Sequence, residues 1–573
     1  MLERQTNNWH AFFAAACVAL LTGCSAFKSH RAWPAPRQSV PEPVSMRCID
    51  RTACDAEQLA RAELAYALAI EAMHDNDPTC VDGFYQAALC VWSCWDRNPQ
   101  TASFTHGRCA ELYRSSLIGL LHEGQRLQRF DPRHGLRVHL RGEWLDIPVR
   151  YHGFAWHSDD FNELEVVGDY QTKDLNCAYR CPGIGVPAVA TRVRCQKENF
   201  LSKECSFPAT VLLRHDTFEH ADARVPAVLE LYDPLRVNNI VIGEQVLPLA
   251  KDKSAHLAKA LDAEPRDYLQ GFVQPGIVTP DEQGLMMVEP YQPGKIPIVL
   301  VHGLLSDQLT WTNLINEVSS CPELLERYQL WTFQYPTGEA FLRSSATLRH
   351  DMETLRQQVD PEGTDPALLN AVMVGHSMGG LISKMQIASS GDQVWYAFSN
   401  RPFEEVVMEP PIRERLHKAA FFEPSPMISR VVFIGTPHHG SAIAQRTLGR
   451  VASLLVKPRP EFAVQHKRLV ESNPGTFSDE FSRRIPTSID LLEPSSPSLA
   501  VMDQLPLNPN VRIYSIVGEG SWMPGAGQSD GVVPISSAHY PLADSEKNVR
   551  SKHSKLTNDR AVIEEVVRIL KSD

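Results

Sequence analysis

The sequence lacks the long run of one charge sign that is typical of proteins whose main partner is nucleic acid. Its 573 residues carry 56 Lys and Arg against 68 Asp and Glu, which gives a formal net charge of −12. A net acidic chain without a Lys/Arg-rich segment argues against nucleic acid as a partner. No apolar run of about 20 residues is present either, and 43% hydrophobic with 22% charged residues is an ordinary globular composition.

Cysteine is almost missing from the second half of the chain. Of 13 cysteines, only Cys321 lies beyond Cys205. No CxxC pair exists, so a zinc site is a weak alternative and no metal is predicted. Ten cysteines remain once Cys17 and Cys24 are assigned to an export leader, an even number that favours disulfides in an oxidising compartment. These ten are Cys48, Cys54, Cys80, Cys90, Cys94, Cys109, Cys177, Cys181, Cys195 and Cys205.

The N-terminus has the pattern of an export leader. An apolar run of about a dozen residues, Trp9 to Leu21, is too short to span a bilayer comfortably and ends in Leu21-Thr22-Gly23-Cys24. This ending resembles the lipobox of bacterial lipoproteins, which implies that residues 1–24 are a signal peptide and that Cys24 is lipidated. The protein would then face the periplasm or exterior from the cell envelope, and the Ser25 that follows favours the outer membrane. The alternative is an ordinary signal peptide in which Cys24 is incidental.

The segment after the leader divides into three regions by pattern. Residues 25–44 are polar and Pro-rich, which is typical of a tether. Residues 45–134 contain three stretches with helical periodicity, and 135–290 contain short strand patterns separated by turn residues. The string 179–190, with two glycines and two prolines, predicts a loop within this β-rich accessory domain. The β-rich region shows no acid/base cluster and no metal-ligand spacing.

Residues 291–573 have the pattern of an α/β domain. Apolar, β-branched runs such as IPIVLV, NAVMV, RVVFI and VRIYSIV alternate with helical segments. Runs of this kind are typical of parallel strands that helices cover on both faces. We therefore expect a mostly parallel, doubly wound sheet in this region.

The strongest motif in this region surrounds Ser377. The run 371–374 leads into Gly375-His376-Ser377-Met378-Gly379, and a helical segment follows. A strand, a tight turn and a helix are the context in which G-x-S-x-G forms a nucleophile elbow. The alternative is a Gly-rich turn that carries an ordinary serine.

A second motif follows the first strand of this region, where His302-Gly303-Leu304 succeeds IPIVLV. Together with the Ser377 motif it resembles the α/β-hydrolases, in which such a pair shapes the oxyanion loop. The resemblance implies that the backbone N–H groups of Met378 and Leu304 stabilise an oxyanion. The side chain of His302 is expected to be structural.

The acid and the base should follow Ser377 in the order Asp, then His. Asp530 lies in a loop after the strand pattern VRIYSIV, and Asp490 is the alternative. His553 lies just before the last helical segment and is favoured as the base over His539. His553 would take the proton of Ser377, and Asp530 would hold the imidazole tautomer.

A third motif, GTPHHGS at 435–441, resembles lipases and lipase-like esterases, including the group of glycosylphosphatidylinositol-inositol deacylases. The neighbouring His438 and His439 suggest a metal, but no carboxylate is spaced in the sequence to join them. Two insertions lie near 390–429 and 451–510, and the first is rich in aromatic residues, with Phe421 and Phe422 predicted to contact a long acyl chain. The two insertions predict either lids over the nucleophile or simple packing on the core.

These motifs predict a serine hydrolase of carboxylic esters, lipase-like, that forms a covalent acyl-enzyme and needs no cofactor. Its partners would be an ester or lipid substrate and, through a lipid anchor, the membrane. An acyltransferase with the same three residues, or an inactive lipid-anchored binding or scaffold protein, are the alternatives. The oligomeric state is not encoded in any pattern.

Overall fold

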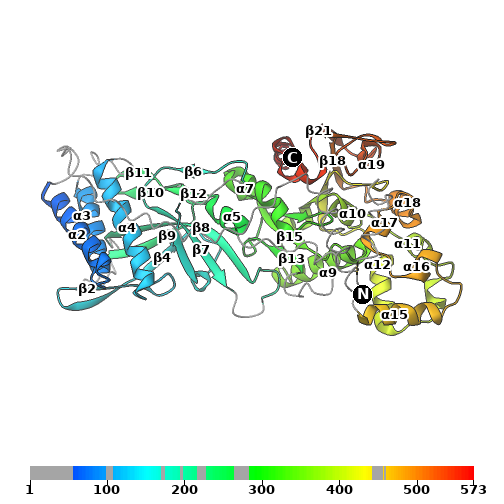
Figure 1. The fold of residues 1–573 in the computed structure, drawn as a ribbon, viewed down its shortest axis with the longest axis horizontal. Helices are drawn as coiled ribbons and strands as arrows, with labels where there is room; N and C mark the ends of the chain where they lie inside the picture. The colour runs from blue at the N-terminus through cyan, green and yellow to red at the C-terminus, as the bar shows by residue number, and fades with distance from the viewer. Residues whose placement is uncertain are drawn as a thin grey trace, which may run out of the picture.

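The computed structural model describes residues 56–97, 107–168, 175–193, 198–215, 227–262, 283–441, 456 and 460–572. The predicted leader, Cys24 and the tether lie outside the described residues. The described chain forms two parts that lie side by side along the longest axis, as Figure 1 shows. We name them the N-terminal module, residues 56–262, and the C-terminal domain, residues 283–572.

The N-terminal module begins with three helices, in the region where the sequence predicts them. They are α2 (Ala56–His74), α3 (Cys80–Arg97) and α4 (Arg108–Arg126). A five-stranded sheet packs beside the helices (Figure 1). Its strands, in spatial order, are β4 (Val149–His152), β9 (Ala227–Tyr232), β8 (Glu204–His215), β7 (Val186–Val193) and β5 (Glu163–Val166). All neighbours are antiparallel except β4 and β9.

The helices and the sheet of this module share one hydrophobic core. The rings of Trp92, Trp95 and Tyr113 contact one another in tilted or edge-to-face arrangements, with centroids 4.9–5.8 Å apart. The Tyr113 hydroxyl donates to the Leu213 carbonyl oxygen at 2.7 Å, which joins α4 to β8. The helical and β-rich regions distinguished in the sequence therefore fold around a single core.

Short strands and one helix complete the module, and one of them overturns a prediction. The segment 179–190 is expected to be a loop, but it contains β6 (Arg180–Cys181) and the start of β7. The strand β6 forms because it pairs antiparallel with β12 (Lys251–Asp252). The remaining elements are β1 (Phe130–Asp131), β2 (Gly135–Leu140), β3 (Glu143–Ile147), η1 (Ser158–Asp160), β6 (Arg180–Cys181), β10 (Asn239–Ile242), β11 (Gln245–Pro248), β12 (Lys251–Asp252) and α5 (Ala255–Asp262).

The C-terminal domain is built on a seven-stranded sheet. In spatial order its strands are β13 (Gly284–Met287), β15 (Tyr328–Gln334), β14 (Ile296–Val301), β16 (Ala371–His376), β17 (Ile428–Ile434), β18 (Arg512–Gly518) and β21 (Ser545–Val549). Only β13 is antiparallel to its neighbour. The predicted mostly parallel sheet is thus confirmed.

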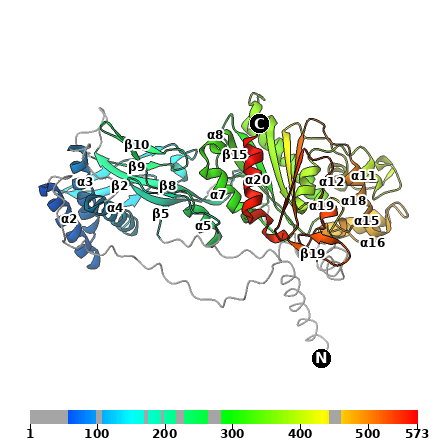
Figure 2. The same ribbon diagram turned by 90° about the horizontal axis from the view of Figure 1, so that it is seen from above.

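Helices cover both faces of this sheet, and Figure 2 shows α20 and α7 together on one of them. Side chains alternate along each strand, so that Val299 and Val301 enter one core while Ile298 and Leu300 enter the other. The first core is closed by α9 (Phe341–Val359) and α10 (Met378–Lys384). The second is closed by α7 (Thr312–Ser320), α8 (Pro322–Arg327) and α20 (Arg560–Lys571).

The two insertions pack against each other at one end of the domain. The first contains α11 (Gln393–Tyr396), η5 (Phe403–Glu405) and α12 (Pro410–Ala420). The second contains α15 (Pro460–Glu471), α16 (Asp479–Arg483), α17 (Ser488–Leu491) and α18 (Pro497–Gln504). Trp395 contacts Phe477 edge to face, and Phe398 contacts Phe481.

Shorter elements complete the C-terminal domain. They are η3 (Gln308–Trp311), η4 (Pro366–Asn370), β19 (Ser521–Met523), β20 (Gly527–Ser529), α19 (Ile535–Ala538) and η6 (His553–Asn558).

The disulfide prediction is wrong for six of its ten cysteines, which are free thiols in the structure. Together with Cys321, seven described cysteines are free. They are Cys80, Cys90, Cys109, Cys177, Cys181, Cys205 and Cys321. Cys94 is the exception, as a disulfide-bonded residue. Cys48, Cys54 and Cys195 lie outside the described residues. Within the described ranges, no helix is both long and apolar enough to cross a membrane.

Candidate active site

The backbone at Ser377 forms the sharp turn that the sequence predicts between β16 and α10. Ser377 has φ 54° and ψ −125°, a left-handed φ that costs about 1–3 kcal/mol in a residue with a side chain. The flanking positions must be glycine because a side chain there would collide with neighbouring backbone atoms. A Cβ on Gly375 would lie 2.6 Å from the Gly379 carbonyl oxygen, and one on Gly379 would lie 2.2 Å from that of Val301. The turn therefore holds the hydroxyl at the carboxyl end of the central strand.

Three side chains that are distant in sequence form one hydrogen-bonded chain at this turn. The Nε2 atom of His553 lies 2.8 Å from the Oγ atom of Ser377, and its Nδ1 atom lies 2.6 Å from an Oδ atom of Asp530. All three residues are buried. His553 begins η6, and Asp530 follows β20 in the loop after β18. This is the serine, base and acid geometry of nucleophilic acyl transfer.

The carboxylate of Asp530 is held ionised by its surroundings. Burial raises the pKa of Asp530, but the charge and hydrogen bond of His553 and two backbone N–H groups outweigh this effect, so the pKa lies below its usual value. The N–H groups of Val532 and Val533 donate to the second carboxylate oxygen at 2.9 and 2.7 Å. The Asp530 carbonyl also accepts the His553 N–H at 2.9 Å. Asp530 thus fixes both the ring and the backbone of the candidate base.

His376 supports the base in a way that the sequence did not reveal. Its Nε2 atom lies 3.2 Å from the carbonyl oxygen of His553, and the two rings are 4.8 Å apart. Burial, reinforced by the nearby His553, lowers the pKa of His376 to about 3, so its imidazole is neutral and can donate this hydrogen bond. The only available signal was its place as the variable residue of the G-x-S-x-G motif.

The loop after β14 passes directly beside the serine. A Cβ on Gly303 would lie 3.0 Å from that of Ser377. His302 is buried and stacks on Tyr335, whose hydroxyl donates to the His302 carbonyl at 2.6 Å. Burial lowers the pKa of His302 to about 4, consistent with a neutral structural imidazole. Neither the Met378 nor the Leu304 backbone N–H donates to another described residue, which leaves both amides available.

The alternative acid and base are occupied elsewhere. Asp490 accepts from the Thr487 backbone N–H at 2.8 Å and forms an ion pair with Arg484 at 2.5 Å. His539 is exposed, and its Nδ1 atom lies 2.7 Å from a carboxylate oxygen of Glu546. Neither residue contacts Ser377.

The two histidines of GTPHHGS differ in their surroundings. The ring of His438 is buried between Phe433 and Tyr540. His439 does meet a carboxylate, since its Nε2 atom lies 3.0 Å from Asp503, which also pairs with Lys384. This contact was invisible in the sequence because Asp503 comes from α18. No group of three or more His, Cys, Asp or Glu in the described part of the chain could hold a metal.

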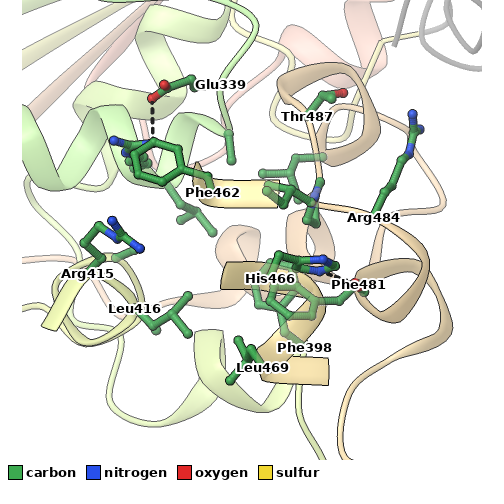
Figure 3. A pocket seen from close by; sticks show the side chains of 18 of the residues that line it. Glu339, Phe398, Arg415, Leu416, Phe462, His466, Leu469, Phe481, Arg484 and Thr487 are labelled. Atoms are coloured by element: carbon green, nitrogen blue, oxygen red, sulfur yellow. Dashed lines mark hydrogen bonds and ion pairs between the residues drawn. The ribbon is translucent and has the colours of Figure 1, made fainter. Parts of the chain in front are cut away.

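A cavity of about 360 Å³ lies between the two insertions. Figure 3 shows Phe398, His466 and Phe481 on one side of it and Arg415 with Leu416 on the other. None of Ser377, His553, Met378 and Leu304 lines it. It comes near them through the segment 337–340, because the Leu305 N–H donates to Thr337 at 3.3 Å while Gly338 to Ala340 form part of the cavity wall.

The N-terminal module also contacts the segment that carries His553. The Asn176 side chain donates to the Asn558 carbonyl oxygen at 2.7 Å, and Asn558 is the last residue of η6. The Asn176 backbone N–H donates to the Asn313 side chain at 2.7 Å, and that side chain in turn donates to Asn558 at 2.9 Å. The two parts of the molecule therefore meet at the turn that positions the candidate base.

Comparison with protein families agrees with the topology. Residues 298–539 match the model of the alpha/beta hydrolase family. This range includes the elbow, the loop after β14 and Asp530, while His553 lies beyond it. The C-terminal domain is an α/β-hydrolase fold.

Solved structures similar to this chain include bacterial lipases and esterases. A lipase of Bacillus licheniformis in mature form is 16% identical, with a TM-score of 0.31, over 50% of this chain and 97% of its own. A lipase of Staphylococcus hyicus is 13% identical, with a TM-score of 0.30, over 49% and 96%. EstA from Clostridium botulinum is 12% identical, with a TM-score of 0.30, over 49% and 87%. A comparison with curated proteins found no match.

Proposed function

We propose that the protein is a serine hydrolase of carboxylic esters, lipase-like, with Ser377 as nucleophile, His553 as base and Asp530 as orienting acid. The observation that carries the proposal is the buried chain of hydrogen bonds from Asp530 through His553 to Ser377. Such a chain in a hydrolase fold matches the recognised roles of a catalytic triad.

The reaction follows from these positions. The Oγ atom of Ser377 attacks the ester carbonyl carbon while His553 Nε2 takes its proton. His553 then gives this proton to the leaving alcohol as the carbon–oxygen bond breaks, which leaves an acyl group on Ser377. Water, deprotonated by His553, attacks the acyl-enzyme, and His553 returns this proton to Ser377 Oγ as the acyl–oxygen bond breaks; the carboxylic acid that departs then loses its own proton to solvent.

The backbone N–H groups of Met378 and Leu304 are the proposed donors to the oxyanion. Their hydrogen-bonding capacity is unused among the described residues; Met378 follows Ser377 in the chain, and Leu304 follows Gly303, which lies beside Ser377. Amides that are fixed before the reaction lower the barrier because they need no reorganisation when charge develops, and one such donor is worth about 10²–10³ in rate.

The cavity between the insertions supports an ester with an apolar acyl chain as substrate. Its size falls within the range of small-molecule sites, and most of its wall is apolar. Trp395, Phe398 and Phe481 line it, and each buried CH₂ of a ligand contributes about 0.8 kcal/mol. The likeness of GTPHHGS to lipases and inositol deacylases points to the same substrate class.

We also propose that the enzyme is anchored in a bacterial cell envelope through a lipid on Cys24. The support is the sequence 21–24 and the Pro-rich stretch 25–44, which would separate the lipid from the folded parts. A Cys24→Ser variant should appear in the soluble fraction and keep its esterase activity. Membrane retention of this variant in high salt would contradict the proposed anchor.

The test of the proposed function is hydrolysis of p-nitrophenyl esters by the purified protein and by Ser377→Ala. We expect turnover by the wild type and a loss of about 10⁵–10⁶ in kcat for the variant, as for other triad serines. Ser429→Ala is the matched control, because this hydroxyl only donates to the Asn370 carbonyl at the opposite end of the sheet. More than a tenth of wild-type activity in Ser377→Ala would overturn the proposal.

A further inference from the structure

The charges around the cavity between the insertions are unevenly balanced. Its wall contains three arginines and one carboxylate, that of Glu339. Glu339 pairs with Arg343 at 3.2 Å, and Arg484 pairs with Asp490 at 2.5 Å. Arg415 forms no ion pair with a described carboxylate, and its guanidinium donates only to the side-chain oxygen of Gln465.

Arg415 is held in this position by an aromatic ring. Its guanidinium lies 4.6 Å from the ring centroid of Phe462, and that of Arg343 lies 4.4 Å from the same ring. Two guanidinium groups therefore share one ring at the edge of an apolar cavity. Burial and then the neighbouring charge of Arg343 lower the pKa of Arg415, and Glu461 offsets only part of this effect. An anion beside Arg415 would relieve this unfavourable arrangement.

The wall beyond Arg415 accepts a hydrocarbon. Leu416, Phe398 and Leu469 line the space, and Trp395 and Phe477 close it from the two insertions. His466, the one histidine of the described wall, donates its Nε2–H to the Phe481 carbonyl at 2.7 Å, which fixes the position of this ring. A molecule that fits both the guanidinium of Arg415 and this apolar wall has an apolar chain and a single anionic end.

We propose that this cavity is a binding site for an anionic amphiphile, with its chain among the aromatic residues and its anionic group at Arg415 beside Arg343. Such a molecule has two sources. One is a fatty carboxylate, the product released by the proposed esterase, and in this respect the inference rests on the proposed function. The other is a lipid with a phosphate headgroup, and both sources share an anion on a hydrocarbon chain.

The experiment measures binding by the full chain with Ser377→Ala, so that no turnover is needed. Decanoate, decanol and decyl phosphate are titrated below their micelle concentrations at pH 8 by calorimetry. We expect decanoate to bind about tenfold more tightly than decanol. Raising the salt from 0.05 to 0.5 M should reduce this preference, because screening acts on the charged ligand alone. Tighter binding of decyl phosphate than of decanoate would also support the site and would favour a lipid phosphate as its source.

Variants at Arg415 identify the residue responsible. Arg415→Gln should bring the decanoate-to-decanol preference close to one without changing decanol affinity, while Arg415→Lys should retain part of it. Arg560→Gln is the matched control, since Arg560 is exposed and pairs with Glu564 on α20. Equal binding of decanoate and decanol by the parent protein, or no binding of either, would overturn the inference. An unchanged preference in Arg415→Gln would overturn it as well. Ester hydrolysis by the wild-type chain, assayed in parallel, reports separately on the proposed function.

Discussion

The N-terminal module and the C-terminal domain both bury a carboxylate, but the two carboxylates are used differently. Glu230 on β9 is fully buried, and its oxygens are bonded to Arg214 at 2.8 Å and to the Tyr232 hydroxyl at 2.7 Å. The negative charge of Glu230 is balanced by the positive charge of Arg214. Asp530 is bonded to an imidazole whose other nitrogen meets a hydroxyl beside two unused amides. A saturated buried pair stabilises a fold, whereas a chain that ends on a hydroxyl beside free donors can carry out chemistry.

The largest effect that would test this contrast is the removal of the candidate base. His553→Ala should lower kcat by about 10⁵–10⁶, because the serine loses the group that accepts its proton. His539→Ala is the matched control and should leave kcat within about twofold, since its imidazole is exposed and bonded to Glu546. The measurement is kcat for a p-nitrophenyl ester. The reverse ranking would transfer the role of base to His539.

A smaller effect is expected from the aromatic wall of the cavity. Replacing both Phe398 and Phe481 by Ala should lower kcat/KM for a decanoyl ester by about 10- to 100-fold and spare the acetyl ester. The reason is the loss of apolar contact worth a few kcal/mol along a long chain. The exposed aromatic Tyr396, outside the cavity wall, provides the control Tyr396→Ala. An equal loss for both esters would show that these rings are needed for folding rather than for chain binding.

The contact between the two parts should have a modest effect on turnover. Asn176→Ala removes the hydrogen bond to the end of η6, and such a bond contributes about 0.5–1.5 kcal/mol. We expect kcat to fall by about two- to fivefold with KM unchanged, because His553 is less firmly positioned while the cavity is intact. Asn370→Ala removes a comparable exposed bond, to the Pro366 carbonyl, and is the control. An unchanged kcat in Asn176→Ala would separate the module from catalysis.

The smallest effect on turnover is expected at Glu230. Glu230→Gln should lower the free energy of unfolding at neutral pH by about 3 kcal/mol, since it leaves the half-buried Arg214 without its counter-charge, yet kcat of the folded protein should not change. Burial raises the pKa of Glu230, but His152 and Arg214 outweigh it and bring the pKa to about 2. Because the pKa is lowered on folding, this stabilisation is present above the ordinary value of about 4.3 and disappears as the pH falls toward 2.

Urea unfolding at pH 6 and at pH 2.5 tests whether the stabilisation by Glu230 decreases as the pH falls. The difference in unfolding free energy between wild type and Glu230→Gln should shrink at the lower pH. A fall in kcat that accompanies the loss of stability would mean that Glu230 takes part in the reaction, which would break the contrast between the two buried carboxylates.

Local patterns predict much of the C-terminal domain. The strands around Val299, Val374 and Val432 are apolar runs that end at turn residues. Such features can be recognised from a few consecutive residues of the sequence. Local patterns also single out Ser377, Asp530 and His553, and in the structure His553 lies within hydrogen-bonding distance of both other residues.

Long-range contacts were not predictable. The bond from His376 to the His553 carbonyl and the contact of Asp503 with His439 each join segments that are far apart in the sequence. The disulfide prediction for the N-terminal module was wrong for six described cysteines because an even count carries no information on distance. The wall of the cavity, likewise, depends on how the two insertions meet: Phe421 stacks on His417 and does not line it.

The central claim is that Ser377 is an activated nucleophile, and a fluorophosphonate probe tests it most directly. Reaction of the folded full chain followed by peptide mass spectrometry should give one adduct, on Ser377, and His553→Ala should label far more slowly because the hydroxyl keeps its proton. Absence of labelling in correctly folded protein, or labelling at another serine, would contradict the account, and absence would favour a lipid-anchored binding protein on a hydrolase scaffold.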